Sequence, residues 1–421
     1  MVELIQISIM SIFAKLLKFL FEIGTSYFVA KETYGEFALL LSYIIIYIKI
    51  ATFGIPKILV REVHKAPDKK SISTLLFNSA LLIFTICTIS YLIISLFAIK
   101  YLSDYPQIFI ITLANSLLIL YSTYLRSIKR VKEWIFFQDI SLYLFYFATL
   151  GGLYLFTQNR FDILFILNIY TLSILGAFIL IFLYIKFFYH IKLLSRLSIP
   201  KLKYLYSHSF PVLFTGLAYL VISRIDIIML SNYVGLDLVG EYNIISRITL
   251  QVLFFNQVIV AYYYPRLAER FIKGQEYHLI SRYNTKFVLL SFFSVIGVTG
   301  ALLIAIKYFS LFEFLNITYK DELYLSFLIL AFTQIIYSAI SFYGNMLIYI
   351  HKQKIEYINS SVVLCLAIGL NFILIPPYGV VGASIATSIA LILGNLFQMG
   401  QVKYFTGSFF ISVDAFKKGK K

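Results

Sequence analysis

Long apolar stretches separated by short polar connections run along the whole chain. Each stretch is long enough for a helix to cross a hydrocarbon core of about 30 Å. Because backbone N–H and C=O groups find no water in lipid, such stretches are expected to be helical. The pattern predicts twelve spans, at residues 5–29, 36–60, 73–99, 107–125, 135–157, 162–185, 209–233, 239–262, 287–308, 322–350, 357–376 and 379–403.

Composition supports this interpretation. The 421 residues are 60% hydrophobic and only 13% charged, whereas soluble domains have about 25% charged residues. The chain is therefore predicted to be an all-α, polytopic membrane protein with about twelve transmembrane helices. Cys87 and Cys365 each lie alone in an apolar run, so neither a disulfide nor a metal site is expected.

The basic residues are distributed unevenly between the two sides of the predicted membrane. Of 36 lysines and arginines, 25 fall after the even-numbered spans or at the C-terminus, and 5 fall in the opposite set of connections. Positive residues concentrate on the cytoplasmic side of membrane proteins, so both termini are predicted to be cytoplasmic. The net charge of +16 then reflects topology, and no nucleic-acid partner is expected. The five histidines are dispersed singly and show no metal-ligand spacing.

A weak internal repeat relates the two halves of the chain. With an offset of 205 residues, 29–37 aligns with 234–242, and Arg61 aligns with Arg266. With small insertions, 130–132 also parallels 352–354. The repeat predicts two domains, 1–205 and 206–421, each a pseudo-symmetric six-helix bundle. In transporters built from such repeats, the substrate site lies at the repeat interface.

Charged residues inside the spans are confined to the first two helices of each half. They are Lys15, Lys18 and Glu22 in the first span, Lys49 and the peripheral Lys57 in the second, Arg224 and Asp226 in the seventh, and Arg247 in the eighth. One charge at the bilayer centre costs about 2.5–3.5 kcal/mol by insertion scales. These charges are therefore expected to be paired, hydrated or bound to a ligand. Asp139 and Glu356 lie nearer to span ends and are expected to be solvated there.

Two interpretations of these charges remain open. In the first, Lys18–Glu22 and an arginine–Asp226 pair are structural salt bridges, and Lys15 reaches the cytoplasmic interface along its apolar stem. In the second, a hydrated cationic cavity between the halves binds an anion, and arginine forks suit a diphosphate. Three polar residues of the eighth span are able either to bond sugar hydroxyls or to link helices. They are Gln251, Asn256 and Gln257.

Five short motifs occur in order along the chain. They are Tyr34-Gly35-Glu36-Phe37, Phe53-Gly54-Ile55-Pro56, Arg224-Ile225-Asp226-Ile227, Val239-Gly240-Glu241-Tyr242 and Tyr378-Gly379-Val380-Val381-Gly382. Together with the span count, they resemble the Wzx-type polysaccharide flippases of the MOP superfamily, which export O-antigen or capsule repeat units. The resemblance implies a MOP/MATE-like fold and alternating access. It also implies diphosphate or glycan binding by cationic residues in the first helices of each half, a role that Lys15, Lys18, Arg224 and Arg247 match in kind.

The function implied is the movement of undecaprenyl-diphosphate-linked oligosaccharide from the cytoplasmic to the outer leaflet of the bacterial inner membrane. Expected partners are that lipid, membrane lipids and other membrane proteins of polysaccharide assembly. Glu22 and Asp226 are candidates for ion or proton coupling. Alternatives are another MOP exporter, for drugs or lipid II, and a polysaccharide polymerase or ligase. The short external connections disfavour the latter. Because nucleotide-binding and metalloprotease motifs are not found, neither an enzyme nor a cofactor is expected.

Overall fold

The computed structural model describes residues 2–66, 68–96, 104–157, 161–191, 195–253, 256, 259, 263, 277–350 and 352–409. Regular structure in this part of the chain is helical, apart from an isolated parallel bridge between Val29 and Phe161. The chain divides into two compact units, Met1–Val221 and Ile222–Lys421. The division at residues 205/206, drawn from the repeat, stays a prediction.

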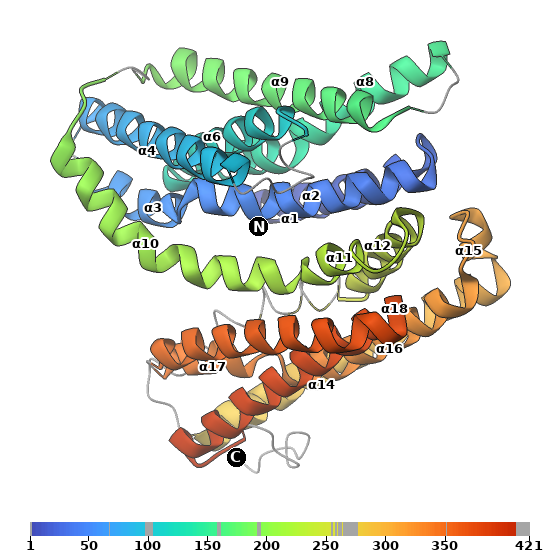
Figure 1. Ribbon diagram of the computed structural model, residues 1–421. Coiled ribbons are helices and arrows are strands. Elements are labelled where there is room, and N and C mark those ends of the chain that lie inside the picture. The colour runs from blue at the N-terminus through green and yellow to red at the C-terminus, as the bar shows by residue number, and fades with distance from the viewer. Residues whose placement is uncertain are drawn as a thin grey trace. The chain divides into compact units, whose positions relative to one another are not determined.

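In the first unit, α6 is the central helix (Figure 1). It contacts α2, α3, α4 and α9, while α1 packs on α7, η2 and α8. The elements of this unit are α1 (Val2–Gly24), η1 (Thr25–Tyr27), α2 (Lys31–Thr52), α3 (Ile55–Lys65), α4 (Lys69–Leu96), α6 (Gln107–Ser127), α7 (Val131–Ile135), η2 (Phe136–Ile140), α8 (Ser141–Thr157), α9 (Ile163–Tyr189) and nearly all of α10 (Ile199–Ile222).

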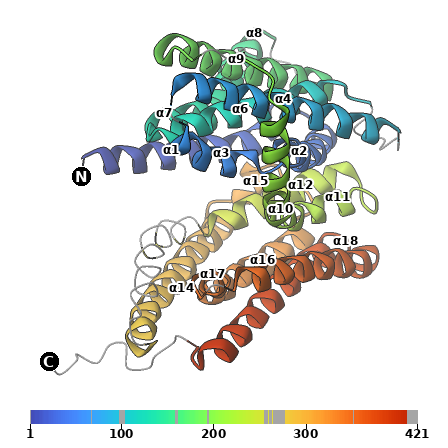
Figure 2. The same ribbon diagram turned by 90° about the vertical axis from the view of Figure 1, so that its left-hand side faces the viewer.

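In the second unit, α16 takes the corresponding central place. It contacts α12, α14 and α18, and Figure 2 shows α16 beside α18. The elements are α11 (Ile225–Leu230), α12 (Leu236–Gln251), α14 (Tyr277–Tyr308), α15 (Leu311–Phe314), α16 (Lys320–Ile340), α17 (Tyr343–Tyr349) and α18 (Gln353–Thr406).

Every predicted span falls on one to three consecutive helices, where the structure describes it. Among the described residues, seven helices are long and apolar enough to cross a membrane, one of them running over 53 residues from Lys354 to Thr406. At 1.5 Å per residue, such a helix is more than twice the thickness of a bilayer. It therefore supplies two spans. The prediction of an all-α, polytopic membrane fold is confirmed.

The two arms of α18 are separated at Gly379, whose backbone (φ 51°, ψ −129°) leaves the helical region. The arms then run antiparallel, since Gly382 lies against Leu374 close to the break and Gly394 lies against Val363 farther from it. The Gln398 amide donates to both Glu356 carboxylate oxygens at 3.1 Å, and Asn359 and Gln401 exchange amide hydrogen bonds of 2.7 and 3.0 Å. These bonds satisfy polar groups inside the bundle. The expectation that Glu356 is simply solvated at a helix end is therefore wrong.

The repeat is visible in the backbone. The starts of α2 and α12 are 205 residues apart, and the residues before them, Ala30 (φ −67°, ψ 156°) and Gly235 (φ −63°, ψ 150°), adopt the same conformation. One turn later, the aligned glutamates Glu36 and Glu241 each hold the connection that leads into the central helix of their unit. Glu36 accepts a bond from Tyr105 at 2.6 Å, just before α6. Glu241 accepts bonds from residues 318 and 319, just before α16.

Candidate functional site

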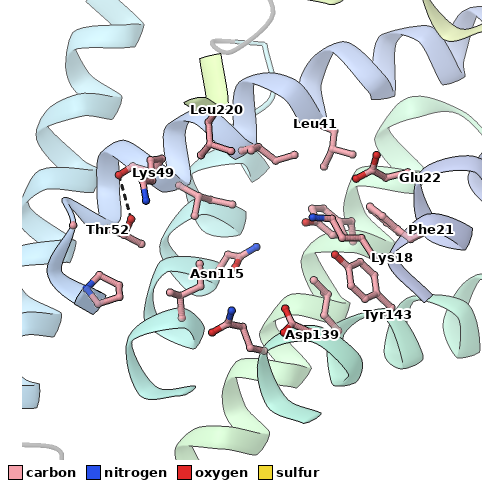
Figure 3. Close-up of a pocket in the computed structure, with 18 of the residues that line it drawn as sticks. Lys18, Phe21, Glu22, Leu41, Lys49, Thr52, Asn115, Asp139, Tyr143 and Leu220 are labelled. Carbon is pink, nitrogen blue, oxygen red and sulfur yellow. Dashed lines mark hydrogen bonds between the residues drawn. The ribbon is translucent and has the colours of Figure 1, made fainter. Parts of the chain in front are cut away.

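A cavity of about 320 Å³ lies within the first unit (Figure 3). Side chains from α1, α2, α3, α6, η2, α8 and α9 line it, together with Leu220 of α10. The volume is at the lower end of the roughly 300–1,000 Å³ typical of ligand pockets. The cavity is therefore suited to a small head group or to part of a larger molecule.

One face of α1 forms the first wall. Lys18, Phe21 and Glu22 are three and four residues apart, the spacing of neighbours on a helix surface. Phe21 anchors this face, because its ring stacks on Tyr170 at 5.3 Å and meets Tyr146 edge-on at 4.7 Å. Aromatic pairs of this kind each contribute about 0.5–1.5 kcal/mol beyond burial. The side chain of Glu22 is only 6% exposed.

The second wall is the break between α2 and α3. Phe53 (φ 51°, ψ 24°) and Gly54 (φ 74°, ψ 0°) both adopt left-handed backbone conformations, which a bulky residue such as Phe rarely does. Stacking of Phe53 on Tyr206 at 5.1 Å helps to stabilise this arrangement. The break brings Lys49, near the end of α2, and Lys57, from the start of α3, to the same cavity.

The third wall is a π-helical turn, η2, between α7 and α8. Such turns are rare and occur frequently at functional sites. It presents Gln138 and Asp139 to the cavity. Gln138 Oε1 accepts bonds from Trp134 Nε1 at 2.7 Å and from Ser122 Oγ at 2.9 Å. Asp139 is therefore a half-buried residue in the wall of the cavity, within the π turn and not at the free end of a helix.

The charges of the cavity are nearly balanced. Lys18, Lys49 and Lys57 face Glu22 and Asp139, so three positive charges meet two negative ones and the formal surplus is one. The charge of Lys18 acts on the Asp139 carboxylate. Lys15, by contrast, lies outside the cavity lining. Of the predicted site residues of the first half, Lys18, Glu22 and Lys49 are brought together.

The predicted charges of the second half form another cluster, in the second unit. Arg224, Asp226 and Arg247 are 5–6% exposed. Arg224 occupies the break between α10 and α11 (φ −136°, ψ −10°). Asp226 Oδ2 accepts a bond from the Tyr242 hydroxyl at 2.9 Å, and its carboxylate experiences the charges of both arginines. Arg247 Nε donates to Asn243 Oδ1 at 3.1 Å.

The three polar residues of the eighth span have different surroundings. Gln251 is half-buried at the end of α12. Asn256 is buried, and its Oδ1 accepts a bond from the Ser291 hydroxyl of α14, so this side chain links helices. Gln257 lies outside the described residues. In the part of the chain that the structure describes, no group of three His, Cys, Asp or Glu side chains is arranged to hold a metal ion.

Besides Thr52, five polar residues of the cavity were not predicted from the sequence. All but Asp139 are uncharged, and their polar groups do not interrupt an apolar run strongly enough to stand out. Asp139 itself follows Gln138 within a run of aromatic and aliphatic residues, which was the one available signal. The five are Asn115, Gln138, Asp139, Tyr143 and Tyr170.

Comparison with solved structures gives the fold. The lipid II flippase MurJ, in an inward closed conformation, matches over 95% of this chain and 87% of its own, with a TM-score of 0.71 and 16% identity. The MATE multidrug transporter DinF-BH matches over 96% and 95%, with a TM-score of 0.65 and 16% identity. An inward-facing multidrug resistance MATE transporter of the MOP superfamily matches over 94% and 96%, with a TM-score of 0.60 and 15% identity.

Sequence comparison gives the family. A comparison with curated proteins finds no significant match. Residues 3–271, well over half of the chain and including both charged clusters, match the family described as polysaccharide biosynthesis protein. This multi-pass membrane protein, with the fold of MOP-superfamily transporters, therefore belongs to the polysaccharide biosynthesis protein family.

Proposed function

We propose that the protein is a flippase that moves undecaprenyl-diphosphate-linked oligosaccharide repeat units from the cytoplasmic to the outer leaflet of the bacterial inner membrane. The observation that carries this proposal is the cavity between membrane-spanning helices to which Lys18, Lys49 and Lys57 contribute. Its chemistry suits an anionic head group, and the family acts in polysaccharide biosynthesis. The products would serve O-antigen, capsule or exopolysaccharide synthesis.

The physical basis is electrostatic. A lysine in a bilayer-spanning helix is expensive to keep charged without a partner, and Glu22 and Asp139 neutralise only two of the three lysines. A phosphate group accepts hydrogen bonds from lysine ammonium groups, each of which offers three donors. Bonds between charged partners are about twice as strong as neutral ones. A diphosphate would therefore be held more firmly than an uncharged lipid head group.

Alternating access follows as the proposed mechanism, because the fold is shared with transporters. Each half would contribute one charged cluster, at Lys18–Lys49 and at Arg224–Arg247. Glu22 and Asp226 are the proposed carriers of coupling to a proton or sodium gradient. Full, gradient-dependent transport by an Asp226→Asn variant would exclude Asp226 from that role. The surplus of basic residues disfavours a cavity built for cationic drugs.

The proposal is tested by depleting the protein in its own cell. We expect lipid-linked repeat units to accumulate on the cytoplasmic side while surface glycan falls. Complementation by the wild type and by Lys70→Gln, a change at an exposed lysine at the start of α4, should restore surface glycan. Complementation by a Lys18→Gln/Lys49→Gln double variant should not. Unchanged surface glycan without accumulated intermediates after depletion would overturn the proposal.

A further inference from the structure

The charged groups of the cavity in the first unit are distributed unevenly between its two sides. Lys49 and Thr52 lie on one side in Figure 3, and Lys57 comes from the adjacent start of α3. Glu22, Lys18 and Tyr143 lie on the other side, with Asp139 near them. The first side carries two lysines and a formal charge of +2, while the second carries one lysine and two carboxylates, a formal charge of −1. The cavity is therefore polarised from one side to the other.

On the acidic side, hydrogen bonds fix the orientation of the Gln138 side-chain amide. The indole Nε1–H of Trp134 can only donate, so the Gln138 atom that meets it at 2.7 Å must be the amide oxygen. Ser122 Oγ donates to the same oxygen at 2.9 Å. With both lone pairs of the oxygen used, the NH₂ group is the part of this cavity-lining side chain that is left to donate. The π turn and these two donors thus fix an amide and a carboxylate side by side in the cavity wall.

This side offers the chemistry that recognises sugar hydroxyls. Carboxylates accept hydrogen bonds at up to four lone-pair sites, and amides both donate and accept. Glu22 and Asp139 supply the carboxylates, and Tyr143 supplies an aromatic ring with a polar tip. Gln138, next to Asp139, and Asn115, between the two sides in Figure 3, supply the amides. A lysine-lined phosphate site would not need such a wall. A sugar carboxylate, as in a uronic acid, would meet two like charges there.

We propose that this acid–amide wall is a subsite for a neutral, hydroxyl-bearing sugar ring, the one attached directly to the diphosphate, and that it discriminates against an acidic sugar at that position. Lys49 and Lys57 would hold the phosphates from the first side, and Lys18 would reach them from the second. This inference rests on the proposed function and deepens it, since it names the class of the first sugar. The cavity volume of about 320 Å³ admits a head group and part of a glycan, so the remaining sugars would lie outside it.

The test uses Trp134, the one tryptophan in the chain, whose indole bonds to Gln138 in the cavity wall. Its fluorescence reports titration of the purified protein with three polyprenyl diphosphates: bare, carrying one N-acetylhexosamine, and carrying one hexuronic acid. Calorimetry provides an independent affinity. For the wild type we expect the neutral-sugar lipid to bind at least fivefold more tightly than the bare lipid, and the uronic-acid lipid to bind more weakly than the bare lipid.

The variants separate this subsite from the phosphate side. Asp139→Asn should remove the preference for the neutral sugar and improve binding of the uronic-acid lipid, with affinity for the bare lipid within about twofold of wild type. Asn115→Ala, on a different helix, should also reduce the preference for the neutral sugar. Asp162→Asn, at an exposed aspartate before α9, is the matched control and should change nothing.

Two results would overturn the inference alone. One is equal wild-type affinity for all three lipids. The other is an Asp139→Asn variant that binds bare and sugar-bearing lipids equally less well than wild type, which would mean that Asp139 only positions Lys18. A wild-type protein that binds none of the three lipids would overturn the proposed function as well.

Discussion

Glu241 and Glu36 occupy the same place in the two halves but make different numbers of bonds, so replacing each should destabilise the protein to a different degree. The Glu241 carboxylate accepts from three donors of one connection: the Thr318 amide at 2.9–3.1 Å, the Thr318 hydroxyl at 2.5 Å and the Tyr319 amide at 3.2 Å. Glu36 accepts the Tyr105 hydroxyl at 2.6 Å.

The magnitudes follow from this difference. A hydrogen bond to a charged group contributes about 1.5–3 kcal/mol. Water can replace part of the lost hydrogen bonding, because the connections that donate these bonds are only partly buried. We therefore expect Glu241→Ala to lower the free energy of unfolding by about 4–5 kcal/mol and Glu36→Ala by about 1.5–2 kcal/mol, each near the low end of the per-bond range. Glu32→Ala, at an exposed glutamate in the first turn of α2, should have almost no effect.

The assay is thermal denaturation of the purified protein in detergent, followed by the fraction that remains monodisperse on size exclusion. Because membrane proteins often unfold irreversibly, the order of the variants at one heating rate is the quantity compared. We expect Glu241→Ala to be the least stable, then Glu36→Ala, with Glu32→Ala close to wild type. A Glu36→Ala variant at least as unstable as Glu241→Ala would refute the reasoning. So would a Glu241→Ala variant as stable as Glu32→Ala.

Three further predictions concern α18 and the topology. A Cβ at Gly394 would lie 2.4 Å from Val363 Cγ2, whereas one at Gly400 would meet nothing within 4 Å. Gly394→Ala should therefore cost about 1–3 kcal/mol of stability, measured by thermal denaturation, and Gly400→Ala should not. Adding Val363→Ala to the Gly394→Ala variant should restore its stability. Failure of that rescue would contradict the antiparallel arrangement of the arms. A double-mutant cycle on Asn359 and Gln401 should give a coupling of about 0.6–1.7 kcal/mol, and additive effects would exclude a direct bond. A green fluorescent protein fused to the C-terminus should fluoresce and an alkaline phosphatase fused there should be inactive, whereas the reverse would invert the predicted orientation.

The broad architecture was predictable from the sequence because it depends on long-range regularities. Apolar runs gave the helices, and an offset of 205 residues gave the matching starts of α2 and α12. Lys18, Glu22 and Lys49 were selected as charges inside apolar spans, and all three line the cavity. The cost of a charge in lipid thus identified three of the cavity residues, although Lys15, selected on the same ground, lies outside the lining.

The remaining cavity residues could not be predicted from the sequence, for a physical reason. Helical periodicity assumes 3.6 residues per turn, and the π turn at η2 breaks that count, so the direction of Asp139 does not follow from its spacing to other residues. The polar role of tyrosine hydroxyls was also not predicted from the sequence. Tyr242 reads as apolar in a hydropathy pattern, although its hydroxyl bonds to the buried Asp226. Partners of this kind are determined by tertiary contacts.

The most direct test of the central claim measures transbilayer movement in proteoliposomes. The purified protein is reconstituted with a fluorescent polyprenyl diphosphate carrying one neutral sugar, and quenching reports the lipid that reaches the opposite leaflet. Loss of two lysine contacts, each worth about 1 kcal/mol in a partly hydrated cavity, corresponds to a fall of roughly thirtyfold. We predict at least a tenfold lower rate for Lys18→Gln/Lys49→Gln, with Lys70→Gln unchanged. A double variant that moves the lipid at the wild-type rate would contradict the account.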